Sequence, residues 1–132
     1  MQVRPELMPP HLVPERRPQE LTLQFFELLD AEFQKLLTGD GEPLEHTEDY
    51  AALLRVHTHY LTNTVTEQTG QSPCAWINAR YLAEAKRLLH ETDLSIAAIS
   101  TQLGFSEPTN FSKYFKKHLG LSPKAFREQA PA

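Results

Sequence analysis

Two stretches of the chain repeat one pattern, and this pattern decides the fold. They are Thr69-Gly70-Gln71-Ser72-Pro73-Cys74-Ala75-Trp76 and, 50 residues later, Leu119-Gly120-Leu121-Ser122-Pro123-Lys124-Ala125-Phe126. In both, the glycine is a typical end of one helix. The Ser-Pro pair is a typical start of the next helix, with a capping hydroxyl followed by proline at the first helical position. The repeat therefore predicts two helical units with the same local design.

The similarity continues upstream at positions that suit the core of a helix pair. Leu61 and Val65 match Phe111 and Phe115 at the same offset of 50 residues. Further upstream the offset is 49, so one residue is added between the paired helices of the second copy. Each copy thus predicts a helix, a tight turn and a second helix, which are the parts of a helix-turn-helix unit. Any packed helix pair can mimic one such pattern, but two copies joined by one long helix are stronger evidence.

The aliphatic composition supports an all-α fold. The chain has 19 Leu and 12 Ala against 4 Val and 3 Ile, and Leu and Ala favour helices whereas β-branched residues favour strands. Apolar residues spaced by three and four, together with the capping signals, predict about seven helices. We expect them over about residues 20–37, 47–54, 58–68, 73–90, 95–103, 108–118 and from 123 onward.

The 132 residues, 15.1 kDa, suffice for one domain with a tail. Residues 1–19 hold five of the ten prolines and predict a proline-rich tail or linker, with a cloning boundary as the alternative. The expected domain, residues 20–129, comprises a first helix-turn-helix unit over about 47–70, a long connecting helix over about 72–91 and a second unit over about 95–119. No stretch approaches the roughly 20 apolar residues of a membrane span, and the start lacks the apolar core of a signal peptide.

The net charge of −4 argues at first against nucleic acid, because a basic surface is the usual sign of nucleic-acid binding. However, residues 1–55 hold 5 basic and 11 acidic residues, giving −6, whereas residues 56–132 hold 8 and 6, giving +2. Residues 99–127 hold 5 basic residues and 1 acidic residue, giving +4. The total therefore does not exclude DNA. The distribution of charge along the chain places the positive surface on the second unit and predicts that the acidic first helix faces away from DNA.

Four further motifs carry a family resemblance. They are Trp76-Ile77-Asn78-x-Arg80, Glu84-Ala85-Lys86-Arg87-Leu88-Leu89, Ile99-Ser100-x-x-Leu103-Gly104-Phe105 and Phe111-Ser112-Lys113-x-Phe115-Lys116-Lys117-His118-x-Gly120-x-Ser122-Pro123-x-Ala125-Phe126-Arg127. With them the chain resembles the DNA-binding domain of the AraC/XylS family of bacterial transcription regulators, over roughly residues 20–128 and most densely over 69–127. The resemblance implies two recognition helices in successive major-groove faces of an asymmetric site, roughly two turns of duplex long.

Residue roles follow from the resemblance and from the face opposite the expected core. The base-contacting candidates are His59, Thr62, Asn63, Thr109, Asn110 and Lys113. The phosphate-contacting candidates are Thr58, Thr66, Ser112, Lys116 and Lys117. Asparagine can pair with adenine through two hydrogen bonds, and threonine can contact a base edge or a thymine methyl. The alternatives are plain solvent-facing polarity for the first helix, a solvated lysine face for the second, and a phosphate contact for Lys113.

The first recognition helix contains no Lys or Arg and carries Glu67 near its end. Since cations on DNA-binding surfaces supply the salt-dependent affinity, we hypothesise that the first unit contributes little electrostatic affinity and depends on the second for anchoring. The cations of the connecting helix, Arg80, Lys86 and Arg87, are expected to be structural rather than to contact DNA.

Chemistry other than DNA binding finds no support in the sequence. His57 and His59 lie two positions apart, about 200° around a helix, and so could not chelate one metal ion. The single cysteine, Cys74, excludes an internal disulfide or a cysteine-cluster zinc site and fits a reducing compartment. No phosphate loop or paired-carboxylate signature is present. We therefore expect no enzyme activity, no metal and no cofactor.

The sequence thus predicts a bacterial, cytoplasmic, nucleoid-associated transcription regulator that binds double-stranded DNA. The alternative is a protein-interaction module with weak DNA binding, which docks on a sensor domain or an RNA polymerase subunit. Candidate partners besides DNA are RNA polymerase and an effector-binding or dimerisation domain, because many members of the family carry such a domain before this one.

Overall fold

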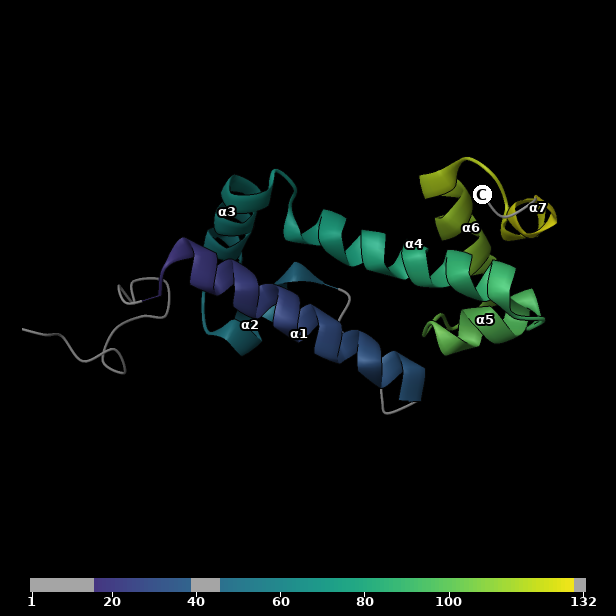
Figure 1. Ribbon diagram of the computed structural model, residues 1–132, viewed down its shortest axis with the longest axis horizontal. Helices are drawn as coiled ribbons and strands as arrows, with labels where there is room; N and C mark the ends of the chain where they lie inside the picture. Colours follow the sequence, from purple (N-terminus) through teal and green to yellow (C-terminus); the bar gives the residue numbers. More distant parts are fainter. Residues whose placement is uncertain (1–15, 39–45, 130–132) are drawn as a thin grey trace, which may run out of the picture. The chain divides into compact units, whose positions relative to one another are not determined.

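The computed structural model describes residues 16–38 and 46–129, and within these ranges the chain forms seven α-helices and no strand (Figure 1). This confirms the all-α prediction. The helices are α1 (Pro18–Thr38), α2 (Thr47–Leu54), α3 (Thr58–Thr69), α4 (Pro73–Glu91), α5 (Ile96–Gln102), α6 (Pro108–Leu119) and α7 (Pro123–Glu128). Most of the predicted tail, residues 1–15, lies outside the described residues. Helix α1 begins at Pro18, slightly before the expected start, because proline is well suited to the first turn of a helix.

The chain divides into two compact units. The first comprises residues 16–34 and 46–77 of the described chain, and the second comprises residues 35–38 and 78–129. Helix α4 is continuous from Pro73 to Glu91 and so contributes to both units. Each unit contains one of the two predicted helix pairs, α2 with α3 and α5 with α6.

The core of the first unit is built from the apolar face of α1 and the inward positions of α2, α3 and the start of α4. Its buried members include Leu21, Phe25, Leu29, Tyr50, Ala51, Leu61, Val65 and Ile77. The rings of Phe25 and Tyr50 pack edge-on with centroids 5.4 Å apart, a preferred aromatic geometry. Because Leu61 and Val65 are fully buried, the orientation of α3 about its own axis is determined.

The core of the second unit follows the same design, with larger side chains on the second helix of the pair. Its buried members are Ala85, Leu88, Leu89, Ile99, Leu103, Phe111 and Phe115. Phe111 and Phe115 occupy on α6 the positions that Leu61 and Val65 occupy on α3, and their rings lie 5.9 Å apart. Phe126 of α7 packs edge-on against Phe115 at 5.5 Å. The repeat in sequence is therefore a repeat in packing.

The turns between the paired helices also correspond. The amide of Val56 donates to the carbonyl of Ala51, and the amide of Phe105 donates to that of Ser100, each at 3.0 Å. Both bonds are of the kind that closes a helix with a left-handed residue. That residue is Arg55 in the first unit, at φ 60°, and Gly104 in the second, at φ 87°. The added residue of the second copy falls after this turn, before α6 begins at Pro108.

Candidate nucleic-acid interface

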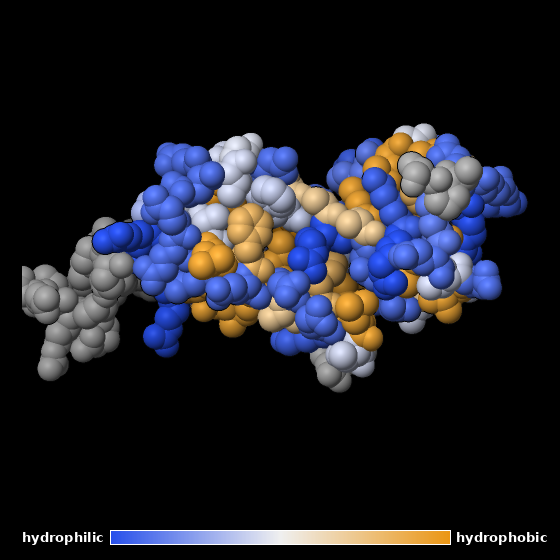
Figure 2. Space-filling model, in the orientation of Figure 1, coloured by the Kyte–Doolittle hydropathy of each residue, from blue (hydrophilic) through white to orange (hydrophobic). Residues whose placement is uncertain are grey.

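Helix α3 presents one polar face opposite its buried face. His59, Asn63 and Thr66 are exposed, Thr62 is half-buried, and Thr58 is exposed at the first position of the helix. At about 100° per residue these five candidates lie within an arc of about 140°. In Figure 2 the visible residues over α3 are mostly white and blue. The structure thus brings together all five residues that the sequence assigned to this helix.

The inward face of α3 is wider than the sequence predicted. Thr64 is only 6% exposed and packs beside Val65 in the core. The helical spacing indicated this position, because residue 64 lies three positions after Leu61. Sequence reasoning missed it because a polar side chain is not a typical core residue. The burial of Thr64 removes one polar side chain of α3 from the accessible surface, where Glu67 and Gln68 are exposed in addition to the five candidates.

Helix α6 presents a similar but strongly basic face. Thr109, Asn110, Lys113, Lys116 and Lys117 are exposed, and Ser112 is half-buried at the edge of the face. The six candidates span an arc of about 160°. Helix α6 carries three lysines and no acidic residue, whereas α3 carries Glu67 and no Lys or Arg. The two faces therefore share a geometry, but the two helices differ by four units of formal charge, with His counted as neutral.

Two polar contacts of the second unit position α6. Ser100, 1% exposed at the crossing of α5 and α6, donates its hydroxyl to the carbonyl of Glu107 at 3.3 Å. A serine therefore fits at this crossing of the two helices. The hydroxyl of Tyr114 donates to Asn78 Oδ1 at 2.6 Å, so α6 is also bonded to α4. Sequence reasoning missed Tyr114, although it lies three positions after the buried Phe111.

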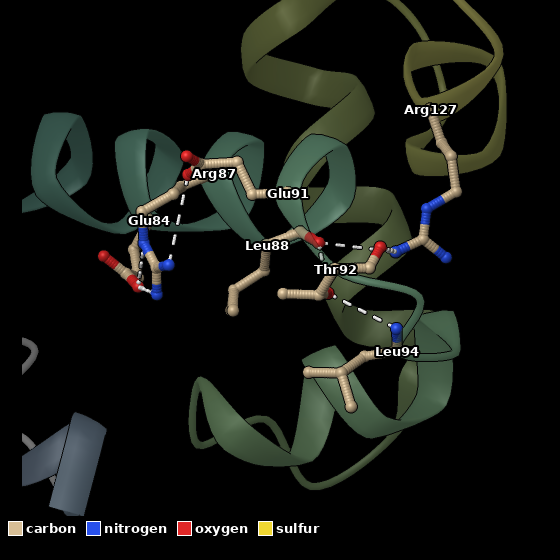
Figure 3. A network of polar contacts seen from close by, with 7 residues as sticks. All are labelled: Glu84, Arg87, Leu88, Glu91, Thr92, Leu94 and Arg127. Atoms are coloured by element: carbon tan, nitrogen blue, oxygen red, sulfur yellow. Dashed lines mark hydrogen bonds and ion pairs between the residues drawn. The ribbon is translucent and has the colours of Figure 1, made fainter.

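Arg127 of α7 caps the end of α4 (Figure 3). Its guanidinium donates to the carbonyls of Leu89, at 2.9 Å, and of Thr92, at 3.2 Å, with a longer contact of 3.4 Å to Leu88. The last carbonyls of a helix lack partners within the helix and carry partial negative charge, so a cation is favourable there. The sequence counted Arg127 in the positive surface of the second unit. The structure corrects this, because its charge is used within the fold.

Arg87 is likewise engaged on α4. It pairs with Glu84, with Arg87 Nε 2.9 Å from Glu84 Oε1, and lies 4.0 Å from Glu91 (Figure 3). The hydrogen bond that Arg87 donates to the Glu84 carboxylate raises the pKa of Arg87, against a smaller opposing effect of desolvation. This agrees with the structural role expected of Arg87.

Residues 16–38 and 46–129 contain no group of three or more His, Cys, Asp or Glu side chains that could hold a metal ion. Of the helices described, none is long and apolar enough to cross a membrane.

Comparison with known proteins places these features in a family. Residues 50–129 match the family described as "Helix-turn-helix domain". The regulatory protein PocR of Salmonella typhimurium is 33% identical over 82 residues, which are 62% of this chain and 27% of PocR. The transcriptional activator RhaS of Pectobacterium carotovorum is 37% identical over 70 residues, 53% of this chain and 25% of RhaS. The chain thus spans about a quarter of the length of these relatives.

Solved structures share the fold. The DNA-binding domain of AdpA, a global transcriptional factor in complex with a target DNA, has a TM-score of 0.64 at 25% identity, covering 79% of this chain and 89% of that one. A transcriptional regulator with an AraC-type DNA-binding domain from Chromobacterium violaceum has a TM-score of 0.65 at 25% identity, covering 86% and 96%. The family match extends over more than half of the chain, and the chain belongs to the helix-turn-helix domain family of the AraC/XylS type.

Proposed function

We propose that this protein binds double-stranded DNA sequence-specifically and thereby regulates transcription. The observation that carries the proposal is the pair of polar faces on α3 and α6, each opposite two fully buried apolar residues of a helix-turn-helix unit. A helix with this arrangement can enter the major groove while its other face stays in the core. The relatives support the proposal, since they are regulators, and one solved neighbour is in complex with a target DNA.

The residue roles are part of the proposal. Base contacts are assigned to His59, Thr62 and Asn63 of α3 and to Thr109, Asn110 and Lys113 of α6. Phosphate contacts are assigned to Thr58, Thr66, Ser112, Lys116 and Lys117. Exposure supports these roles, because nine of the eleven side chains are exposed and the other two, Thr62 and Ser112, are half-buried. Since the two helices differ in sequence, they would contact unlike base sequences in successive major-groove segments, and the site would be asymmetric.

Selection of bound duplexes from a random DNA library tests the function directly. We expect enrichment of a two-part asymmetric site, with the parts about one helical turn, roughly 34 Å, apart. A palindromic site would contradict the assignment of two unlike recognition helices. Failure to enrich any sequence would contradict sequence-specific binding and favour a protein-interaction module.

Salt dependence on the selected duplex tests the roles of individual residues. Lys113→Ala removes a cation that lies in the groove between the phosphates, so it should flatten the log–log slope of affinity against salt, by at most about 0.9, the change expected for a full phosphate contact. Asn63→Ala removes only a neutral base contact, so it should lower affinity at every salt concentration and leave the slope unchanged. A larger change of slope for Asn63→Ala than for Lys113→Ala would contradict these assignments.

The biological setting belongs to the same proposal. The protein would act at the nucleoid in the cytoplasm, without catalysing a reaction. RNA polymerase is the partner through which a DNA-bound regulator of this kind would act. An effector-binding or dimerisation domain is a second candidate partner, because the matched relatives are about four times as long as the part that aligns with this chain. Purified RNA polymerase should then bind more strongly to the protein on its selected duplex than to the duplex alone.

A further inference from the structure

The first unit lacks cations on its recognition helix but not beside it. Over residues 16–34 and 46–77, the described part of this unit, the basic residues are Arg16, Arg17 and Arg55. Arg16 and Arg17 directly precede α1, whereas Arg55 directly follows α2, 38 positions after Arg17. The sequence assigned the two N-terminal arginines to a tail and gave them no role.

A hydrogen bond joins the chain just before α1 to the end of α2. Arg16 Nη1 donates to the carbonyl oxygen of Leu54, the last residue of α2, at 2.5 Å. That carbonyl belongs to the peptide group that joins Leu54 to Arg55, so the guanidinium of Arg16 lies one peptide unit from the backbone of Arg55. Arg17 follows directly in the chain. Figure 1 shows the start of α1 beside the connection from α2 to α3. The position suits a cation, because a helix ends there with unpaired carbonyls.

Arg55 occupies a position where the fold does not favour arginine. It has φ 60° and ψ 43°, a left-handed conformation that is strained for any residue with a Cβ. The corresponding position of the second unit holds Gly104. Arg55 is exposed, and no side-chain hydrogen bond of Arg55 is found within the described ranges. Strained residues occur often at functional sites. An exposed guanidinium just before α3 is placed where it could contact a phosphate.

We propose that Arg17 and Arg55 form a phosphate-binding site of the first unit, positioned by Arg16, which holds the DNA backbone beside the groove that α3 enters. This inference rests on the proposed function. It gives the first unit its own contact with the DNA backbone, whereas the sequence assigned such anchoring to the second unit alone. Guanidinium groups bind phosphate with charge-assisted hydrogen bonds. The acidic residues of α2, Glu48 and Asp49, lie toward the opposite end of that helix, about 8 Å along its axis.

The test is the salt dependence of binding by the full chain to a mixed-sequence DNA duplex, since phosphate contacts do not require a specific site. Arg17→Gln and Arg55→Gly should each flatten the log–log slope by about 0.9, and the double variant by about 1.8. Arg16→Gln should flatten the slope as well, and Arg16→Lys should restore it by keeping a cationic donor for Leu54. The matched control is Lys86→Gln, an exposed cation of α4, which should leave the slope unchanged.

Arg55→Gly separates loss of binding from loss of fold. Glycine relieves the left-handed strain, so the thermal midpoint should rise while DNA affinity falls, whereas a misfolded variant would lose both. If the wild type binds DNA with an affinity that falls with salt, and Arg17→Gln and Arg55→Gly show the same slope as the wild type, the phosphate site is overturned and the proposed function stands. An equal change in Lys86→Gln would overturn it too, as a general charge effect. Absence of wild-type binding at every salt concentration would overturn the proposed function and the site together.

Discussion

Arg127 offers a quantitative test of how the second unit is held together. Replacing it with methionine keeps most of the apolar stem but removes the guanidinium that caps α4. The variant loses the 2.9 Å hydrogen bond to Leu89 and the longer contacts to Thr92 and Leu88. It leaves the carbonyls of Leu89 and Thr92 without the guanidinium donor, whereas the carbonyl of Leu88 still accepts from the amide and hydroxyl of Thr92. The second unit should therefore become less stable.

The size of the loss can be estimated from these contacts. A hydrogen bond that involves a charged group contributes about 1.5–3 kcal/mol, and the half-buried position of Arg127 favours the lower end for the short bond. The two longer contacts and the interaction with the helix end add about 0.5 kcal/mol. The expected total is about 2 kcal/mol, or about a 30-fold change in the unfolding equilibrium. For a unit of this size the thermal midpoint should fall by about 10 °C.

Urea unfolding followed by far-ultraviolet circular dichroism measures this loss. The matched control is Arg87→Met, the same change on the same helix end, at a side chain that is 44% exposed and pairs with Glu84 and Glu91 on the surface. Exposed pairs of this kind contribute about 0.5 kcal/mol or less. Equal losses in the two variants would refute the capping argument, and so would a fully stable Arg127→Met.

Four further changes test the local geometry, each by urea unfolding. Arg55→Gly should stabilise the protein by about 0.5–1 kcal/mol, the left-handed strain less the added chain entropy of glycine. Gly120→Ala should destabilise it by a similar amount, because a Cβ there would meet no atom within 4 Å and only the φ of 81° opposes it; shifts of the same sign in these two variants would refute the backbone argument. Ser122→Ala removes the hydroxyl that accepts from the amide of Ala125 at 3.1 Å and should cost about 1 kcal/mol, with Ser122→Asp retaining most of the stability. Ser100→Val should cost about 1–3 kcal/mol by overpacking the crossing of α5 and α6, and a loss no greater than that of Ser100→Ala would show that the crossing has room.

The helices and their faces follow from local signals in the sequence. The Ser-Pro and glycine signals predicted helix starts and ends that the structure confirms at Pro73, Pro123, Gly70 and Gly120. Apolar periodicity predicted the inward apolar positions of α3 and α6 correctly, because a helical period of 3.6 residues turns spacing directly into direction. The candidate faces of both recognition helices are consequences of the same periodicity.

Tertiary structure alone decided which long-range polar contacts hold the units together. The bonds from Arg16 to Leu54 and from Arg127 to Leu89 each join residues 38 positions apart, and no local pattern marks either partner. For this reason the sequence treated Arg16 as part of a tail and Arg127 as a surface charge. The burial of Thr64 belongs to the same class, since a threonine becomes a core residue only when its neighbours enclose it. Helix formation depends on nearby residues, whereas the role of a charged side chain depends on which backbone groups packing brings within its reach.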